Sequence, residues 1–254
     1  MISGLFHAAF YEPIHNALVA LVSFMPGGDI GLAVVVLTLF IRLILLPFSL
    51  SAARTQRAMK DLQPKIQELK EKHKGNKELE AKGMLDLYRE ARVNPFSSIL
   101  IVLIQLPLLL ALYLVFFRET FASIDPSKLY AFTPIPETTT LLFLGLVAVS
   151  GKSIVLSVLA GITQYLQAQA AMKGSMQPSG TGMQADFQKV MGFQLRYVFP
   201  FIIAAISYTT SGAIALYFIT TNIAGFLQEK YVTRTLNIAD ESRAEQNVLK
   251  IKKG

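Results

Sequence analysis

The feature that most constrains this chain is a run of 21 residues, Ile30–Leu50, in which Arg42 is the single charged side chain. A bilayer core about 30 Å thick is crossed by about 20 apolar residues in a helix, so this run predicts a transmembrane helix. Similar runs recur, and apolar residues make up 52% of the 254 residues while charged residues make up 16%. This composition excludes a large soluble catalytic domain and a disordered chain. We predict an all-α polytopic membrane protein.

The alternation of apolar and polar segments predicts the organisation of the chain. Five spans are expected, at residues 30–50, 94–117, 153–171, 195–211 (with its closing turn) and 212–229. Five polar segments flank them: an interfacial N-terminal helix at 1–29, a charged helical hairpin at 51–93, loops at 118–152 and 172–194, and a basic tail at 230–254. The N-terminal helix is expected to end at Pro26, and the hairpin to turn at Gly75-Asn76. A further span within residues 1–25 is the alternative for the first segment.

The distribution of Lys and Arg predicts the orientation. Residues 51–93, 172–196 and 229–254 contain eleven, three and six of them, whereas residues 1–29 and 118–152 contain none and three. Positively charged loops remain on the cytoplasmic side of a membrane. The N-terminus is therefore expected outside and the C-terminus in the cytoplasm of a bacterium, with the hairpin and the tail on the cytoplasmic side.

Arg42 is the most informative residue of the sequence. A guanidinium stays charged, and placing it mid-span costs about 2.5–3.5 kcal/mol on the insertion scale. No Asp or Glu lies within the apolar part of any span, so the sequence offers Arg42 no intramembrane counter-ion. Snorkelling to the cytoplasmic headgroups is the alternative. An unpaired cation predicts a hydrated site that attracts an external acidic partner.

Other spans contain polar residues that could face Arg42. Thr38 lies one turn before it on the same helical face, and three side chains stand in other apolar runs: Gln105, Gln164 and Asn222. Each alone is typical of helix packing, but together they predict a polar cavity inside the membrane.

The sequence favours no enzyme. It contains no cysteine, which excludes disulfides and thiolate metal sites, and no Ser/His/Asp grouping, metal cluster or phosphate-binding loop stands out. The three histidines, His7, His15 and His73, are expected to be solvated outside the core. We therefore expect no catalytic residues, no metal, no cofactor and no nucleic acid as a direct substrate.

Four ordered blocks carry a family resemblance. They are the Arg-containing run IRLILLPFSL with the later Gln63-Pro64, the run NPFSSILIVLIQLPLLLALY, the short block AGITQYLQ, and the run SGAIALYFITTNIAGFLQ. In order and spacing the chain resembles the YidC/Oxa/Alb superfamily of membrane protein insertases, from about Phe10 to Thr235.

The resemblance implies a function and a set of site residues. It implies a five-helix core around a hydrophilic groove, in which Arg42 attracts acidic segments of nascent membrane proteins and Gln164 is a polar groove position. Thr38 and Phe218 match positions along which a substrate helix leaves, and the substrate is expected to pack along the spans at 153–171 and 212–229. Phe218 stands where Trp or Tyr is frequent in the family, and so lacks that residue's hydrogen bond.

The hairpin resembles the family's cytoplasmic element for substrate reception, which implicates Arg57, Gln63, Pro64 and Lys65. The partners implied are nascent membrane proteins, the ribosome, the signal recognition particle receptor, the Sec translocation channel and the phospholipid bilayer. Two other functions are alternatives: a small transporter or anion channel with Arg42 as counter-charge, and an assembly factor without a groove. The transporter predicts an internal repeat, which the sequence lacks.

Overall fold

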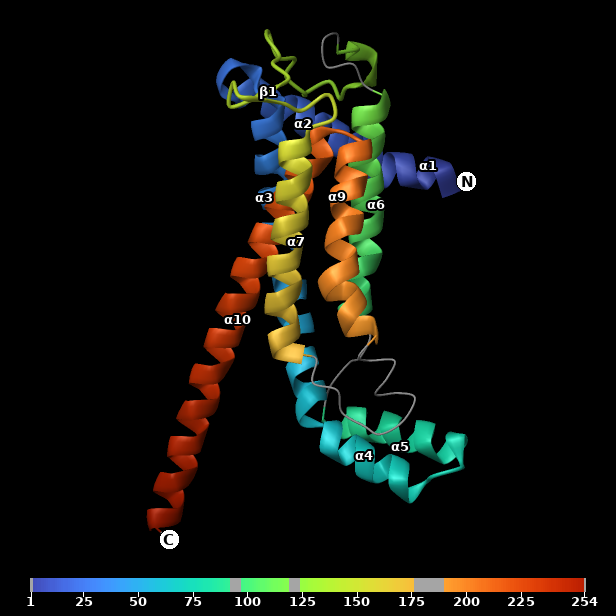
Figure 1. Cartoon of the computed structure of the whole chain (residues 1–254), viewed down its shortest axis with the longest axis vertical. Helices are drawn as coiled ribbons and strands as arrows, with labels where there is room; N and C mark the ends of the chain where they lie inside the picture. The colour runs from blue at the N-terminus through green and yellow to red at the C-terminus, as the bar shows by residue number, and fades with distance from the viewer. Residues whose placement is uncertain (1, 92–96, 119–123, 176–189, 254) are drawn as a thin grey trace.

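A computed structural model of the chain describes residues 2–91, 97–118, 124–175 and 190–253, and every structural statement below concerns these residues. Most of them are helical (Figure 1). The main helices in chain order are α1 (Ile2–Phe6), α2 (Glu12–Phe24), α3 (Ile30–Asp61), α4 (Gln63–Lys72), α5 (Lys77–Glu90), α6 (Ser97–Arg118), α7 (Ile154–Ser175), α9 (Phe199–Thr209) and α10 (Gly212–Lys253). Two π-helical turns, η1 (His7–Tyr11) and η4 (Gln194–Val198), join α1 to α2 and lead into α9.

Three helices are long and apolar enough to cross a membrane: Ile30–Thr55, Ile154–Met172 and Val190–Thr209. Within α6, the stretch Gln105–Phe116 is a shorter apolar helix. The apolar half of α10 also contains the polar side chains Thr220, Thr221 and Asn222, all buried. The structure thus agrees with a helical membrane protein, while the count of five spans stays a prediction.

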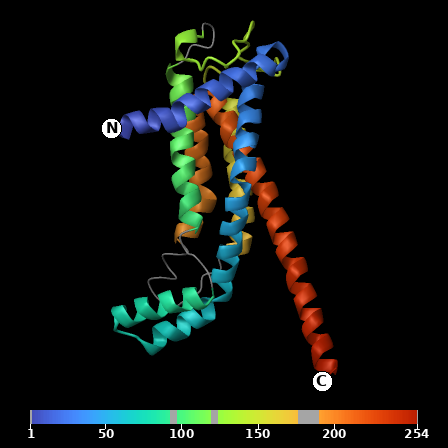
Figure 2. The same cartoon turned by 180° about the vertical axis from the view of Figure 1, so that it is seen from behind.

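The long helices pack in a definite order. α10 packs against α3 and α7, α7 packs against α9, and α6 packs against α3 and the N-terminal helix. Figures 1 and 2 show these helices side by side, with the distal half of α10 projecting away from the others. The most extensive contacts therefore run from α6 through α3, α10 and α7 to α9, and α10 also contacts α9 and α6.

Two helices extend beyond the predicted spans. α3 continues past Leu50 to Asp61, because residues 51–61 are good helix formers and the next Pro is Pro64, in the first turn of α4. α10 continues through the polar tail to Lys253, since no Gly or Pro interrupts residues 226–253. Polarity marks where a helix leaves an apolar layer, and it does not mark where the helix ends.

The N-terminal helix lies across one end of the long helices, with α1 projecting to the side (Figure 2). Its last helical residue is Phe24, and the next residue, Met25, is extended (φ −81°, ψ 141°) before Pro26. The expectation that His15 is solvated is wrong: it is 2% exposed, and its ring stacks on Tyr11 at 5.9 Å. His15 is on the inner face of α2, beside core residues such as Leu18 and Val19, which are both fully buried.

Asn16 ties the loop that follows α6 to this helix. Its Oδ1 accepts hydrogen bonds from the backbone N–H of Tyr130 at 2.7 Å and from the Thr133 hydroxyl at 2.8 Å, and its Nδ2 donates to the Glu12 carbonyl at 2.9 Å. All three bonds are made by one side chain that is 3% exposed. A polar residue in the N-terminal helix thus fixes a segment more than 100 residues away.

A short β-hairpin closes the same end and is the exception to the all-α prediction. Strands β1 (Leu142–Phe143) and β2 (Val147–Ala148) are antiparallel and meet at Leu144 and Gly145, which have φ angles of 51° and 72°. The chain entering the hairpin pairs with the start of α3, where Thr140 donates to the Gly28 carbonyl at 2.9 Å. Gly28 has φ +66°, and a Cβ there would lie 1.9 Å from the Thr138 carbonyl oxygen, so this contact requires glycine.

Asp29 joins the hairpin to α3. Its Oδ1 caps the helix by accepting from the Leu32 N–H at 2.9 Å, and its Oδ2 accepts from the Leu144 N–H at 2.7 Å. The side chain is 5% exposed. One carboxylate thus satisfies an orphan donor of a helix N-terminus and holds a strained turn.

Away from this end, α4 and α5 form an antiparallel pair. They meet at Gly75 (φ +93°) and Asn76, whose Oδ1 accepts from the Leu79 N–H at 3.1 Å and caps α5. Gly83 lets the two helices approach closely, since a Cβ there would lie 2.6 Å from a methyl of Leu69.

We predict that Asp29→Ala destabilises the protein by about 2 kcal/mol, because it removes a cap and leaves the Leu144 N–H without its acceptor. Thermal unfolding of the purified protein in detergent measures the change. Asp125→Ala is the matched control, since Asp125 also caps a turn, through Ser127 N–H at 3.0 Å, but is exposed. Equal effects of the two substitutions would contradict the role of Asp29.

Candidate functional site

Arg42 lies in the apolar half of α3 and its side chain is half-buried. Among the described residues, no hydrogen bond or ion pair to Arg42 is formed by any side chain. Its electrostatic neighbour is Tyr217 of α10, which is 2% exposed. The next two residues of α3, Leu43 and Ile44, are exposed apolar side chains. A fixed positive charge therefore lies at the edge of the packed helices without a carboxylate partner.

Tyr217 connects three helices at this point. Its hydroxyl accepts a hydrogen bond from the Gln105 side-chain amide of α6, and the Arg42 guanidinium of α3 lies close enough to interact with it electrostatically. Gln105 and Arg42, two residues predicted for the site, thus meet at one phenol. We call Arg42, Gln105 and Tyr217 the arginine cluster.

Sequence reasoning missed Tyr217 and chose the adjacent Phe218. The Phe218 ring is 8% exposed and packs edge-on against Tyr217, with centroids 5.5 Å apart. Phe218 has no hydroxyl, but the adjacent Tyr217 provides one. A tyrosine inside an apolar run needs a hydrogen-bond partner for its hydroxyl, and this signal was available in the sequence.

Thr38 is buried, and its hydroxyl donates to the Val34 carbonyl of the same helix at 2.7 Å. This internal bond is a common way for threonine to be accommodated in an apolar helix. Thr38 thus lies one turn before Arg42 on α3, and its hydroxyl hydrogen is already donated within the helix.

Asn222 and Gln164 belong to a second polar group, between α10 and α7. Asn222 Nδ2 donates to the Ala160 carbonyl at 3.4 Å and to the Thr163 hydroxyl at 3.3 Å. Gln164 Nε2 donates to Gln167 Oε1 at 3.5 Å along α7. In the described part of the chain, no hydrogen bond joins this group to the arginine cluster, so the structure does not unite all the predicted residues in one network.

The hairpin residues are placed at the junction of α3 and α4. Gln63 and Pro64 begin α4, and Lys65 is exposed in its first turn. Arg57 lies in α3, and its side chain is outside the described residues. Ile66 is buried and holds this end of the hairpin.

Exposed apolar side chains occur on α3, α6, α7 and α9. On α6 they include Leu106 (59% exposed) and Leu110, and on α9 they include Phe201 (78%) and Ile202. In contrast, Ala213–Phe218 of α10 are all buried. A partner helix therefore has access to α3, α6, α7 and α9, whereas this part of α10 is covered by its neighbours.

The comparison with known proteins decides the family. Residues 21–240 match the family model described as 60Kd inner membrane protein. The chain belongs to the YidC/Oxa/Alb family of membrane protein insertases. The family resemblance seen in the sequence is thus confirmed.

Several bacterial relatives carry the name membrane protein insertase YidC. The chain is 30% identical to the protein of Fusobacterium nucleatum over 207 residues. This aligned region covers 82% of the chain and 87% of the relative. It is 33% identical over 181 residues to that of Clostridium perfringens, covering 70% and 69% of the two chains. A longer relative from Francisella philomiragia is 30% identical over 207 residues, and this matched region is 33% of the relative's length. These names describe insertion rather than a chemical reaction, in agreement with the prediction that the protein is not an enzyme.

We predict that Tyr217→Phe and Gln105→Leu are coupled, because each removes one end of the same buried hydrogen bond. In a double-mutant cycle, the interaction energy is expected at about 0.6 kcal/mol and below about 1.7 kcal/mol, the range for such bonds between membrane helices. Reversible unfolding in mixed micelles measures it. Tyr208→Phe, at an exposed tyrosine of α9, paired with Gln105→Leu is the control and should be additive. Additivity of the Tyr217 pair would contradict the bond.

Proposed function

We propose that this protein inserts nascent membrane proteins through a polar groove centred on Arg42, formed by α3, α6, α7, α9 and the first half of α10. The observation that carries the proposal is the half-buried guanidinium of Arg42, which has a phenol as its electrostatic neighbour and no acidic partner among the described residues. An uncompensated cation in an apolar layer costs free energy. That cost falls when water or the carboxylate of a substrate reaches it.

The packing order favours a route for the substrate between α6 and α9. Both helices contact α10, next to the arginine cluster, and both expose apolar side chains such as Leu106 and Phe201. The substrate helix packs along these surfaces while its short polar segment approaches Arg42. The sequence placed the substrate along the spans at 153–171 and 212–229. The burial of Ala213–Phe218 moves the proposed contact away from the second of these spans, whereas α7, in the first, keeps exposed apolar side chains such as Ile162. Gln164, Asn222 and Phe218 then line or support the groove from α7 and α10.

The driving force is passive. Transfer of the substrate helix into lipid provides about 0.8 kcal/mol per buried methylene group. The membrane potential adds about 2.3 kcal/mol per acidic charge moved outward across 100 mV. The protein lowers the barrier by sheltering the polar segment, and no nucleotide is required for this step.

The cytoplasmic hairpin α4–α5 receives the substrate. It combines exposed basic residues such as Lys65 with a junction at Gln63-Pro64 that links it to α3. Its basic charge suits the ribosome and anionic lipids, and Arg57 lies on the α3 side of the same junction. The signal recognition particle receptor and the Sec channel are further proposed partners.

We predict that Arg42→Ala reduces insertion of a single-span substrate with an acidic translocated tail at least fivefold, and of a matched neutral-tail substrate less than twofold. The reason is that the neutral tail loses no charge pairing, and a coupling of about 1 kcal/mol corresponds to a factor of about five. Liposomes containing the purified protein, with substrate made by cell-free translation, measure this by protease protection. Arg42→Lys should retain most activity.

Lys152→Ala is the control for this assay, because it removes an exposed cation outside the proposed groove. Equal losses for acidic and neutral tails in Arg42→Ala would contradict the charge-pairing role. No insertion above that of empty liposomes by the unmodified protein would contradict the insertase function and favour a transporter or an assembly factor.

We also predict that the N-terminus lies outside and the hairpin in the cytoplasm. The chain has no cysteine, so single cysteines at the exposed positions Glu137 and Lys74 report sidedness without background. A membrane-impermeant maleimide added to intact cells should label Glu137→Cys and spare Lys74→Cys, and both should react after permeabilisation. The reverse pattern would contradict the orientation.

A further inference from the structure

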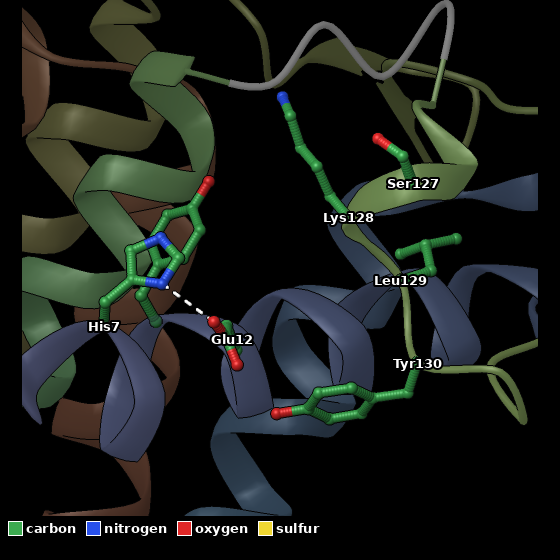
Figure 3. A pocket seen from close by; sticks show the side chains of 7 residues that line it. His7, Glu12, Ser127, Lys128, Leu129 and Tyr130 are labelled. Carbon is green, nitrogen blue, oxygen red and sulfur yellow. Dashed lines mark hydrogen bonds and ion pairs between the residues drawn. The ribbon is translucent and has the colours of Figure 1, made fainter. Parts of the chain in front are cut away.

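A pocket of about 470 Å³ lies apart from the arginine cluster, where the N-terminal helix meets the loop after α6 (Figure 3). One wall consists of His7, Tyr11 and Glu12. The other consists of residues 127–130, of which Ser127 and Lys128 belong to the short helix η3 (Pro126–Lys128). The insertase proposal gives this pocket no role.

The pocket presents one carboxylate and one ammonium group from different walls. Glu12 Oε1 lies 2.9 Å from His7 Nδ1, and in Figure 3 this pair closes one side. Lys128 extends along the opposite side, and the Tyr130 hydroxyl is directed inward from below. Asp125, which holds η3 by accepting from the Ser127 hydroxyl at 2.7 Å, interacts electrostatically with Lys128 from outside the lining. The lining is therefore bipolar and partly aromatic.

The position of the pocket points to a ligand with an apolar part. The helix that forms one wall continues into α1, which projects to the side of the long helices (Figure 2). Leu5 on α1 is 73% exposed, and the rings of Phe6 and Phe10 stack at 5.9 Å. Phe6 and Phe10 pack partly against the core, so Leu5 is the large apolar side chain that the described part of α1 exposes beside the pocket. An exposed apolar residue on a helix beside a polar pocket suits an interfacial position at the membrane surface.

We propose that this pocket binds the headgroup of phosphatidylethanolamine. Lys128 pairs with the phosphate, and Glu12 accepts hydrogen bonds from the primary ammonium, whose charge also suits the ring of Tyr130. The acyl chains lie along α1. In the proposed orientation, with the N-terminus outside, this lipid lies in the outer leaflet. The recognition of the headgroup does not depend on that orientation.

The charge arrangement discriminates among phospholipids. Phosphatidylglycerol offers a phosphate for Lys128 but no cation for Glu12, whose carboxylate is then left facing an anionic ligand. Phosphatidylcholine has a cation, but its quaternary ammonium has no N–H to donate to Glu12. A site with both charges therefore prefers the primary amine.

The test measures lipid binding to the purified full-length protein in detergent by native mass spectrometry. Phosphatidylethanolamine should bind about 10-fold tighter than phosphatidylglycerol or phosphatidylcholine, since a hydrogen bond between charged groups is worth about one decade in affinity. Lys128→Gln should weaken phosphatidylethanolamine about 10-fold. Glu12→Leu, which leaves no acceptor at this position, should abolish its preference over phosphatidylcholine. Lys74→Gln, at an exposed lysine between α4 and α5, should change neither value.

Equal binding of the three lipids by the unmodified protein would overturn the proposal, as would unchanged binding in both pocket variants. Free phosphoethanolamine at millimolar concentration should not displace the lipid, because it lacks the acyl chains. Displacement would show that a soluble phosphorylated amine, rather than a lipid, is the ligand. None of these readouts depends on insertion activity, so a failure here is distinguishable from a failure of the insertase function.

Discussion

The structure depends on one unpaired positive charge in an apolar setting. Arg42 lies on a helix that is otherwise suited to lipid. Its described electrostatic neighbour is the phenol of Tyr217, which in turn accepts a hydrogen bond from Gln105, rather than a carboxylate. A fixed counter-ion would neutralise the charge and remove its attraction for a substrate. In the proposed mechanism, the arginine cluster therefore leaves this charge available to a transient acidic partner.

The two ends of the molecule differ in how closely their segments pack. At the end crossed by α2, Asn16 and Asp29 bind loops that lie more than 100 residues away in the sequence, and Gly28 and the β-hairpin pack closely there. These contacts fix the start of α3 to the loop and to the β-hairpin. At the other end, α4, α5 and the distal half of α10 project away from the long helices (Figure 1). This asymmetry between the two ends is compatible with the insertion from one side that we propose.

Local patterns predicted the features that depend on local chemistry. The end of α2 before Pro26 and the turn at Gly75-Asn76 follow from proline and glycine conformations, and the apolar runs follow from bilayer thickness. The burial of His15, the bonds of Asn16 and the pocket at Lys128 were not predictable in this way, because they arise between segments far apart in the chain. Tyr217 lies between these cases, since its hydroxyl required a partner but only the fold identifies Gln105 as that partner.

The central claim, that a substrate passes between α6 and α9 beside Arg42, is tested most directly by cysteine crosslinking to a ribosome-bound nascent chain. Single cysteines replace Leu106 on α6, Ile202 on α9 and, on the competing surface that the sequence analysis favoured, the comparably exposed Ile162 on α7. The substrate carries one cysteine next to its acidic segment. The account predicts disulfide formation with positions 106 and 202 and little with position 162. Crosslinks that favour position 162, or that do not distinguish the three, would contradict it.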